Sequence, residues 1–174
     1  MTIIATAGSA TANCYITIAD ADTYFAESRY HSEDWTALSD TVKEQVLRWS
    51  TRLIDQFDFV GTRSDPLGVD QRLDWPRSFV PDADTGLYID STTIPFFIAE
   101  ATAEYALFLY REDRTGAAQE DLAQFNKIKV DVIELGIENI TGKKNVVPSS
   151  VLAMLRPYFA DSAPSSFAKK LWRT

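Results

Sequence analysis

Apolar residues recur every three or four positions between residues 39 and 57. At 100° per residue they fall within about 80° of one another on one side of a helix, and polar residues occupy the opposite side. Ser39 or Asp40 is placed to cap the first turn. The pattern predicts an amphipathic helix that ends near Phe57. Its predicted buried stripe is Val42, Val46, Trp49, Leu53 and Phe57, and its polar side is Glu44, Arg48, Thr51, Arg52 and Asp55.

A shorter helix is predicted before this one, at residues 18–29. Thr17 stands at the N-cap position, and two aspartates follow in the first turns, where the helix dipole favours negative charge. The linker after this helix contains Trp35, which we expect in a short turn. Residues 1–14 are small and show no helical period, so they predict an extended arm.

A third helix is predicted at residues 93–113, and it contains the most apolar run of the chain, residues 94–110. Pro95 lies in its first turn, where the missing N–H has no helical partner to lose. The helix is apolar on nearly all sides, and Glu100, Glu104 and Arg111 share one narrow stripe. We expect its own domain or a neighbouring subunit to cover most of it. The run is too short and too charged to span a bilayer comfortably.

Glycines and prolines interrupt the helical pattern between residues 61 and 89. We expect a long loop with a turn at Pro81–Gly86, flanked by short strands at 78–80 and 87–89. Alternating residues predict a strand at 128–132, and a short helix is predicted at 151–159. The residues of that helix expected to face inward are Val151, Leu152, Leu155 and Phe159.

Together these elements predict a mainly α protein, a small helical bundle with a long loop or short β-hairpin insertion and extended arms at both ends. We place a helical domain at residues 1–160, which includes the arm at 1–14. A separate tail is placed at residues 161–174.

Charge is distributed unevenly along this chain. Its 174 residues include 17 Lys and Arg and 25 Asp and Glu, a net charge of −8. Residues 143–174 hold six basic residues against the single acid Asp161, a net charge of +5, which leaves −13 on residues 1–142. The acidic body argues against a general nucleic-acid binder, whose affinity comes from basic side chains on phosphates. The basic tail suits an acidic neighbour.

Residues suited to catalysis or metal binding are scarce. His31 is the only histidine and Cys14 the only cysteine, so a multi-histidine metal site and an internal disulfide are both excluded. Residues 82–86 resemble the start of a calcium loop, but Thr93 stands where the bidentate glutamate is needed. No glycine-rich phosphate motif is present. We therefore expect no enzyme activity, no cofactor and no metal.

One set of motifs points to a family. A Tyr-x-Thr-x-Ala-x-Ala-Asp-x-Tyr opening is followed by a linker tryptophan, a Gly-x-Arg and a Gln-x-Leu-x-Trp-Pro-Arg box. Over residues 15–159 the chain resembles the head–tail connector proteins of tailed bacteriophages, also called adaptor or head-completion proteins and also described as DnaT-like single-stranded-DNA-binding proteins. The motif residues, candidates for the core or for an interface, are Tyr15, Asp22, Tyr24, Trp35, Arg63, Gln71, Leu73, Trp75, Pro76 and Arg77.

The resemblance implies a structural protein of the virion neck, made in the cytoplasm of a bacterial host. Such subunits form a ring, commonly of twelve copies, that joins the portal to tail, nozzle or tail-completion proteins. Genomic double-stranded DNA passes through the central channel without sequence-specific binding, and no membrane, catalysis or cofactor is involved. An acidic body suits a channel wall, because carboxylates repel phosphates.

The tail has the pattern of a docking segment. With Ser165 or Ser166 as its cap, apolar residues fall on one side of a short helix and basic residues on the other. Eight residues are too few for a stable isolated helix, so we expect a partner groove, that of the portal, to order it. The predicted portal-docking residues are Phe167, Lys169, Lys170, Leu171, Trp172 and Arg173.

The alternative function is single-stranded-DNA binding as a replication accessory. Proteins of this class stack bases on aromatic side chains beside a basic groove. The aromatic residues available for stacking are Tyr15, Tyr24, Trp35 and Trp75. Residues 1–142 offer no continuous basic run to accompany them. A tail terminator or another minor virion protein would differ from the adaptor in its partners rather than in its physics.

Overall fold

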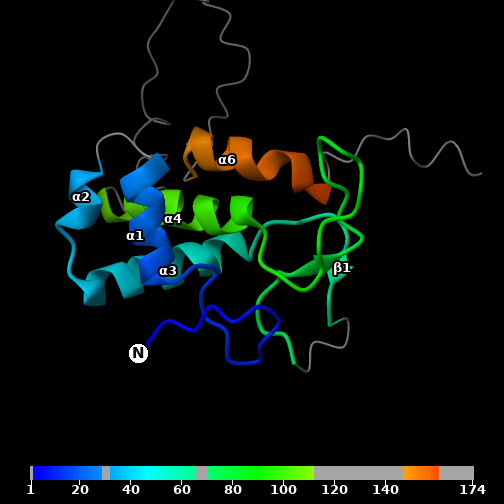
Figure 1. Cartoon of the computed structure of the whole chain (residues 1–174), viewed down its shortest axis with the longest axis horizontal. Coiled ribbons are helices and arrows are strands. Elements are labelled where there is room, and N and C mark those ends of the chain that lie inside the picture. The colour runs from blue at the N-terminus through cyan, green and yellow to red at the C-terminus, as the bar shows by residue number, and fades with distance from the viewer. Residues whose placement is uncertain (1, 29–31, 66–69, 112–146, 161–174) are drawn as a thin grey trace, which may run out of the picture.

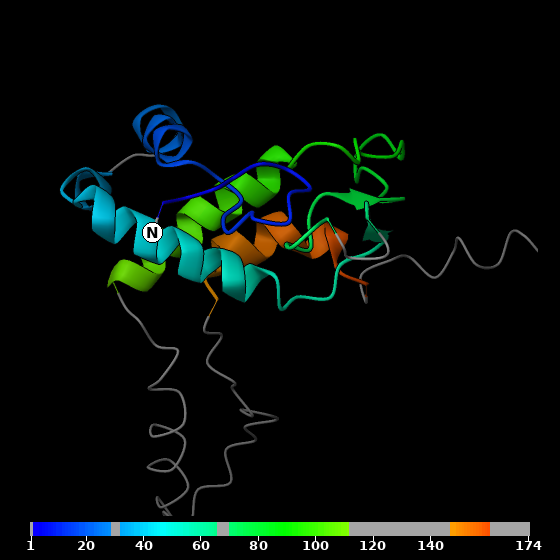
Figure 2. The ribbon, with the colours of Figure 1, turned by 90° about the horizontal axis from the view of Figure 1, so that it is seen from below.

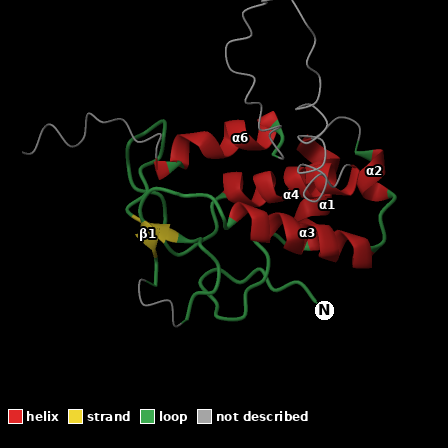
Figure 3. Cartoon of the chain, turned by 180° about the vertical axis from the view of Figure 1, so that it is seen from behind, coloured by secondary structure: helices red, strands yellow, loops and turns green. Residues whose placement is uncertain are grey.

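Helices make up about half of the chain that the computed structural model describes, which is residues 2–28, 32–65, 70–111 and 147–160. Three helices, α3, α4 and α6, lie side by side, and a loop-rich region with a two-stranded sheet occupies one end (Figures 1 and 3). The predicted mainly α class is confirmed. The elements in chain order are α1 (Ile18–Ser28), α2 (Glu33–Thr36), α3 (Asp40–Ile54), β1 (Thr62–Arg63), β2 (Arg77–Ser78), α4 (Phe96–Arg111), α6 (Ser149–Leu155) and the 3₁₀ helix η2 (Arg156–Tyr158).

α4 is the central helix. It packs against α3, α1 and α6 (Figure 2). Most of its residues from Phe97 to Leu109 are buried. Small side chains let the neighbouring backbones approach, and the Ser50 hydroxyl of α3 donates to the carbonyl of Thr102 at 3.0 Å. The prediction of a helix covered on most sides is confirmed. No described helix reaches the length and apolarity needed to cross a bilayer.

The predicted amphipathic helix is present as α3, but the prediction of its most buried side was wrong. α3 ends at Ile54, and the predicted stripe of residues 42–57 is only partly buried. Leu47 and Ile54 form the deepest side instead, together with Thr51, which was expected on the polar side. Thr51 tolerates burial because its hydroxyl donates to the carbonyl of Leu47 at 2.9 Å. The N-terminal segment packs over this side of the helix, and the pattern of a single helix does not reveal that cover.

Residues 2–14 contain no helix or strand, and they fold back on themselves rather than project outward. The backbone N–H of Asn13 donates to the carbonyl of Ile4 at 2.9 Å, and the Ile4 N–H donates to the Asn13 side chain at 2.8 Å. Ala12 and Cys14 are buried. The segment is therefore packed as part of the helical body.

The sheet is smaller than predicted and lies elsewhere. β1 pairs antiparallel with β2, with Thr62 opposite Ser78, and this pairing was not predicted. The predicted turn at Pro81–Gly86 is present, but its flanking strands reduce to one bridge between Pro81 and Tyr88. Two features shorten the ladder: Pro81 has no N–H to donate, and Phe79 has a positive φ of 62°.

The C-terminal helix is confirmed with two corrections. α6 begins after Pro148 and tightens into η2, so that Tyr158 joins the core. Leu152 and Phe159, which were expected to face inward, are only partly buried. The predicted strand at 128–132, His31 and the tail at 161–174 lie outside the described residues.

Candidate functional site

The motif residues gather in two clusters, and the first lies where α3 meets the loops. The Tyr15 hydroxyl donates to Oδ1 of Asp55, the residue that follows α3. The same oxygen accepts the backbone N–H of Asp74 at 3.2 Å, and the Tyr15 oxygen accepts the backbone N–H of Trp75 at 3.2 Å. This chain of hydrogen bonds fixes the motif loop to α3 and to the N-terminal segment.

Arg77 is the centre of this cluster. Its guanidinium donates to the three consecutive carbonyl oxygens of residues 59–61 at 2.9–3.0 Å. Its remaining nitrogen pairs with Asp74 Oδ2 at 2.5 Å, while Arg63 Nε binds the other oxygen of Asp74 at 3.2 Å. Both predicted arginines therefore pair with an acid of their own chain. A planar group with five donors fits this set of acceptors, and an ammonium does not.

Gln71 is buried inside the same loop, and its side-chain amide hydrogen-bonds to three backbone groups. Its Nε2 donates to the carbonyls of Leu73 and Pro76 at 2.9 and 2.8 Å, and its Oε1 accepts the N–H of Asp65 at 3.0 Å. The Trp75–Pro76 peptide bond is cis. The hydrogen bonds of Gln71 hold residues 71–76 in a tight loop.

Trp75 lies in the core, where Phe59 and Phe97 contact its ring edge-on with centroids 5.4 and 5.6 Å away. Leu73 belongs to the same buried group. The indole N–H of Trp75 has no hydrogen-bond partner among the described residues. Trp75 and Leu73 therefore lie in the core of the subunit, which is one of the two roles predicted for the motif residues.

The second cluster joins the other helices. Asp22 of α1 accepts the indole N–H of Trp35 at 2.7 Å and pairs with Lys43 of α3 at 2.8 Å. The Tyr24 hydroxyl donates to Glu104 of α4 at 3.0 Å. The predicted cap of α1 is confirmed, since Thr17 Oγ1 accepts the Asp20 N–H at 3.1 Å. Trp35 is buried in the short helix α2, close to its predicted turn.

Burial governs the ionisable groups of the first cluster. It raises the pKa of the Asp55 carboxyl above its ordinary value, although the hydrogen bond from Tyr15 opposes that rise. Burial and the Asp55 charge raise the pKa of the Tyr15 hydroxyl well above its ordinary value, so this group stays a donor at neutral pH. Burial also raises the pKa of the Cys14 thiol. The cluster is thus suited to holding loops together. Among the described residues, no three Asp, Glu, His or Cys side chains gather to hold a metal.

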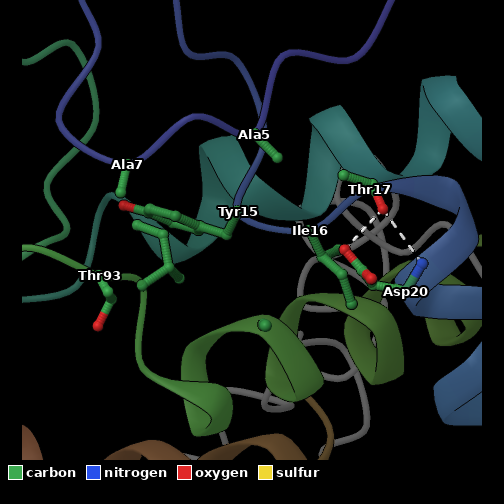
Figure 4. A pocket seen from close by; sticks show the side chains of 9 residues that line it. Ala5, Ala7, Tyr15, Ile16, Thr17, Asp20 and Thr93 are labelled. Carbon is green, nitrogen blue, oxygen red and sulfur yellow. Dashed lines mark hydrogen bonds between the residues drawn. The ribbon is translucent and has the colours of Figure 1, made fainter.

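A hollow of about 310 Å³ lies between the N-terminal segment and the start of α4 (Figure 4). Its only charged residue is Asp20, whose carboxylate accepts the Thr17 hydroxyl at 2.7 Å. No basic side chain lines it, so it does not suit a phosphate. The residues that line it are Ala5, Ala7, Tyr15, Ile16, Thr17, Asp20, Thr93, Ile94 and Ala99.

The exposed feature that sequence reasoning missed is the turn between Phe79 and Ile89, which we call the aromatic hairpin. Phe79, Leu87 and Tyr88 are 68%, 71% and 69% exposed, and the Phe79 and Tyr88 ring centroids lie 6.0 Å apart. Three large apolar residues within a turn-rich segment were the available signal. The six predicted portal-docking residues, Phe167, Lys169, Lys170, Leu171, Trp172 and Arg173, lie outside the described residues.

A family model described as "Putative DnaT-like ssDNA binding protein" matches residues 1–174. No curated protein and no solved structure matches the chain. The match spans the motif clusters, the aromatic hairpin and both chain ends. The chain therefore belongs to this DnaT-like family.

Proposed function

We propose that the protein is a structural assembly subunit of the head-to-tail adaptor kind. The aromatic hairpin is the observation that carries this proposal. A group of large apolar side chains held outward on an acidic protein is typical of a protein–protein contact. An adaptor subunit needs such surface, because each copy in a ring touches two neighbours through different faces.

In this role the subunit forms a ring, commonly of twelve copies, between the portal and a tail-side protein in the phage neck. The tail with Phe167, Leu171 and Trp172 docks on the portal. Acidic side chains predominate in the described body and keep DNA in the channel from adhering. The role requires no catalysis and no cofactor.

Single-stranded-DNA binding is the second candidate, and the description of the matching family favours it more directly than the adaptor role. Burial and charge weigh against it. Tyr15, Trp35 and Trp75 are at most 2% exposed, so bases cannot stack on them without unfolding the core. The exposed rings of Phe79 and Tyr88 are accompanied by acids, and residues 79–95 include no Lys or Arg.

Two measurements on the full chain separate these functions. Native mass spectrometry with purified portal is expected to give a stoichiometric ring of subunits on the portal. Fluorescence anisotropy with a labelled single strand of about thirty nucleotides, long enough for more than one site, is expected to show no binding even at low salt. Tight binding that weakens steeply as salt rises, without ring formation, would establish the second candidate instead.

A matched pair of variants tests the role of the hairpin. Tyr88→Ser removes an exposed ring from the hairpin, and Phe96→Ser removes an equally exposed ring, 75% accessible, from the start of α4. Ring formation on the portal is expected to weaken at least tenfold with the first variant and to change little with the second. Equal effects would mean that the hairpin is not the contact.

A further inference from the structure

Backbone hydrogen bonds and one buried residue fix the shape of the aromatic hairpin. The Ile89 N–H donates to Val80 at 2.9 Å, the Asp82 N–H donates to Leu87 at 2.7 Å, and Val80 is fully buried as an anchor. Phe79 takes a left-handed φ of 62°, a backbone conformation that is unfavourable for a non-glycine residue. The packed loop therefore holds the ring outward where it cannot turn into the core.

Negative charge surrounds these apolar side chains. Asp82 accepts the N–H and the hydroxyl of Thr85, both at 2.8 Å, and Asp90 accepts the hydroxyls of two following threonines. These hydrogen bonds lower the pKa of both carboxyls, so the two groups stay ionised. Asp84 is exposed on the same turn. A matching partner surface is apolar with several positive charges.

The described chain ends beside the hairpin. Burial, with a contribution from Asp82 and Asp84, raises the pKa of Tyr158, and the backbone of Ala83 hydrogen-bonds to the Tyr158 hydroxyl. Two residues later the N–H of Ala160 donates to the backbone carbonyl of Asp58 at 2.9 Å, which fixes the last described residue to the domain. Figure 1 shows the end of η2 next to this green loop.

The C-terminal segment has the complementary chemistry. It supplies apolar Phe167, Leu171 and Trp172 together with Lys169, Lys170 and Arg173. Phe167 lies seven positions after Ala160, and an extended chain of seven residue steps reaches about 23 Å. A short tether also gives the segment an effective concentration in the millimolar range, which favours even a weak contact.

From this geometry and complementarity we propose that residues 165–174 dock on the aromatic hairpin of their own chain in the free subunit. Apolar side chains cover Phe79, Leu87 and Tyr88, and the basic residues face the hairpin carboxylates. A partner that captures the segment then uncovers the hairpin, so one binding event exposes a second contact surface. The docking concerns a single chain and stands or falls independently of the proposed function.

Disulfide trapping in the full chain tests this docking. Leu87→Cys combined with Leu171→Cys is expected to form an intrachain disulfide on mild oxidation at least ten times faster than Tyr110→Cys with Leu171→Cys. Tyr110 is also exposed but lies at the far end of α4 (Figure 1). Cys14 is buried and does not compete. Equal rates for the two pairs, or covalent dimers alone, would overturn the proposal, and the dimers would assign the hairpin to a second copy.

Charge reversal gives a second readout that needs no introduced cysteine. In hydroxyl-radical footprinting of the wild-type chain, Phe79 and Tyr88 are expected to be protected from oxidation. The double variant Lys169→Glu with Lys170→Glu is expected to raise the oxidation of both side chains several-fold. Adding Asp84→Lys is expected to restore part of the protection. Asp84 suits this swap because its backbone N–H bonds within the turn. Oxidation that is unchanged by the reversal would contradict the docking.

Discussion

The Arg77 side chain donates hydrogen bonds to three consecutive backbone carbonyls that lie outside the helices and strands. The carbonyl oxygens of residues 59–61 would otherwise lie near the core without donors, which is costly for buried polar groups. Asp74 balances the guanidinium charge and positions it. The arginine of the Trp-Pro-Arg box thus holds residues 59–61 against the motif loop.

Replacing Asp74 tests how much this arrangement of Arg77 stabilises the fold. Asp74→Asn leaves Arg77 and Arg63 without their carboxylate, and we expect a loss of about 2–3 kcal/mol in the free energy of unfolding. Asp34→Asn breaks the ion pair with Arg111, in which both side chains are largely exposed, and is expected to cost less than about 1 kcal/mol. Urea unfolding measures both. Similar losses would show that the buried pair is no stronger than the surface one.

Asp55 gives the fold a distinctive pH dependence. Its folded-state pKa is raised by burial, so the native state holds this proton more tightly than the unfolded chain. The contribution of Asp55 to stability therefore falls as the pH rises from its ordinary pKa of 3.8 through its raised folded-state pKa. Asp55→Asn cannot titrate, so the stability of the variant relative to wild type is expected to improve across that window. Urea unfolding between pH 3.5 and about pH 7 checks the sign; a constant difference would contradict it.

At the scale of elements, the short sheet depends on close approach at Gly61. Its φ is +77°, and a Cβ there would lie 2.4 Å from the carbonyl oxygen of Ser78. Gly86 has a similar φ of +69° but open space around it. Substitutions at the two glycines therefore distinguish the cost of a left-handed backbone from the cost of a steric clash.

Alanine at these two positions is expected to have unequal effects. Gly86→Ala pays only for the left-handed conformation, about 1 kcal/mol. Gly61→Ala adds the clash with β2 and is expected to cost at least about twice as much. Thermal unfolding by circular dichroism gives the comparison, and equal melting temperatures would exclude the clash as a significant term.

The sequence predicts these elements as far as local patterns reach. The Thr17 cap, the covered α4 and the turn at residues 81–86 follow from short-range signals. The side that α3 buries does not, because the folded-back segment ending at Tyr15 covers Thr51. Likewise, Asp55 reads as a solvent-facing helical residue until a tyrosine 40 positions earlier donates to it. The roles of the Gln71 and Arg77 motif residues also depend on loop geometry that residue periodicity does not encode.

At the scale of the molecule, two hydrophobic clusters among the described residues share the same helices. One cluster contains Tyr15, Trp75 and Ile98 near the loop-rich end, and the other contains Trp35 and Leu107 around α1 and α2. α3 and α4 run through both. The clusters are therefore expected to unfold together in one transition.

A core substitution in either cluster tests this cooperativity. Ile98→Ala and Leu107→Ala each remove a fully buried side chain and are expected to cost about 2–5 kcal/mol. Tyr110→Ala at the exposed end of α4 is expected to stay within about 0.5 kcal/mol of wild type. Unfolding curves from far-ultraviolet circular dichroism and from tryptophan fluorescence should coincide for all three. Separate midpoints would mean that the clusters unfold independently.

The small residues of α4 have a consequence for how this family can diverge. Ala101, Ala103 and Ala106 have no accessible surface, and neighbouring helices fill the space beside them. A larger side chain there would push α4 out of line. Across homologous chains we therefore expect these alignment columns to stay limited to glycine, alanine and serine. Phe96 and Tyr110 are exposed, so the residue type at these two positions can vary between homologous chains or change together with a binding partner.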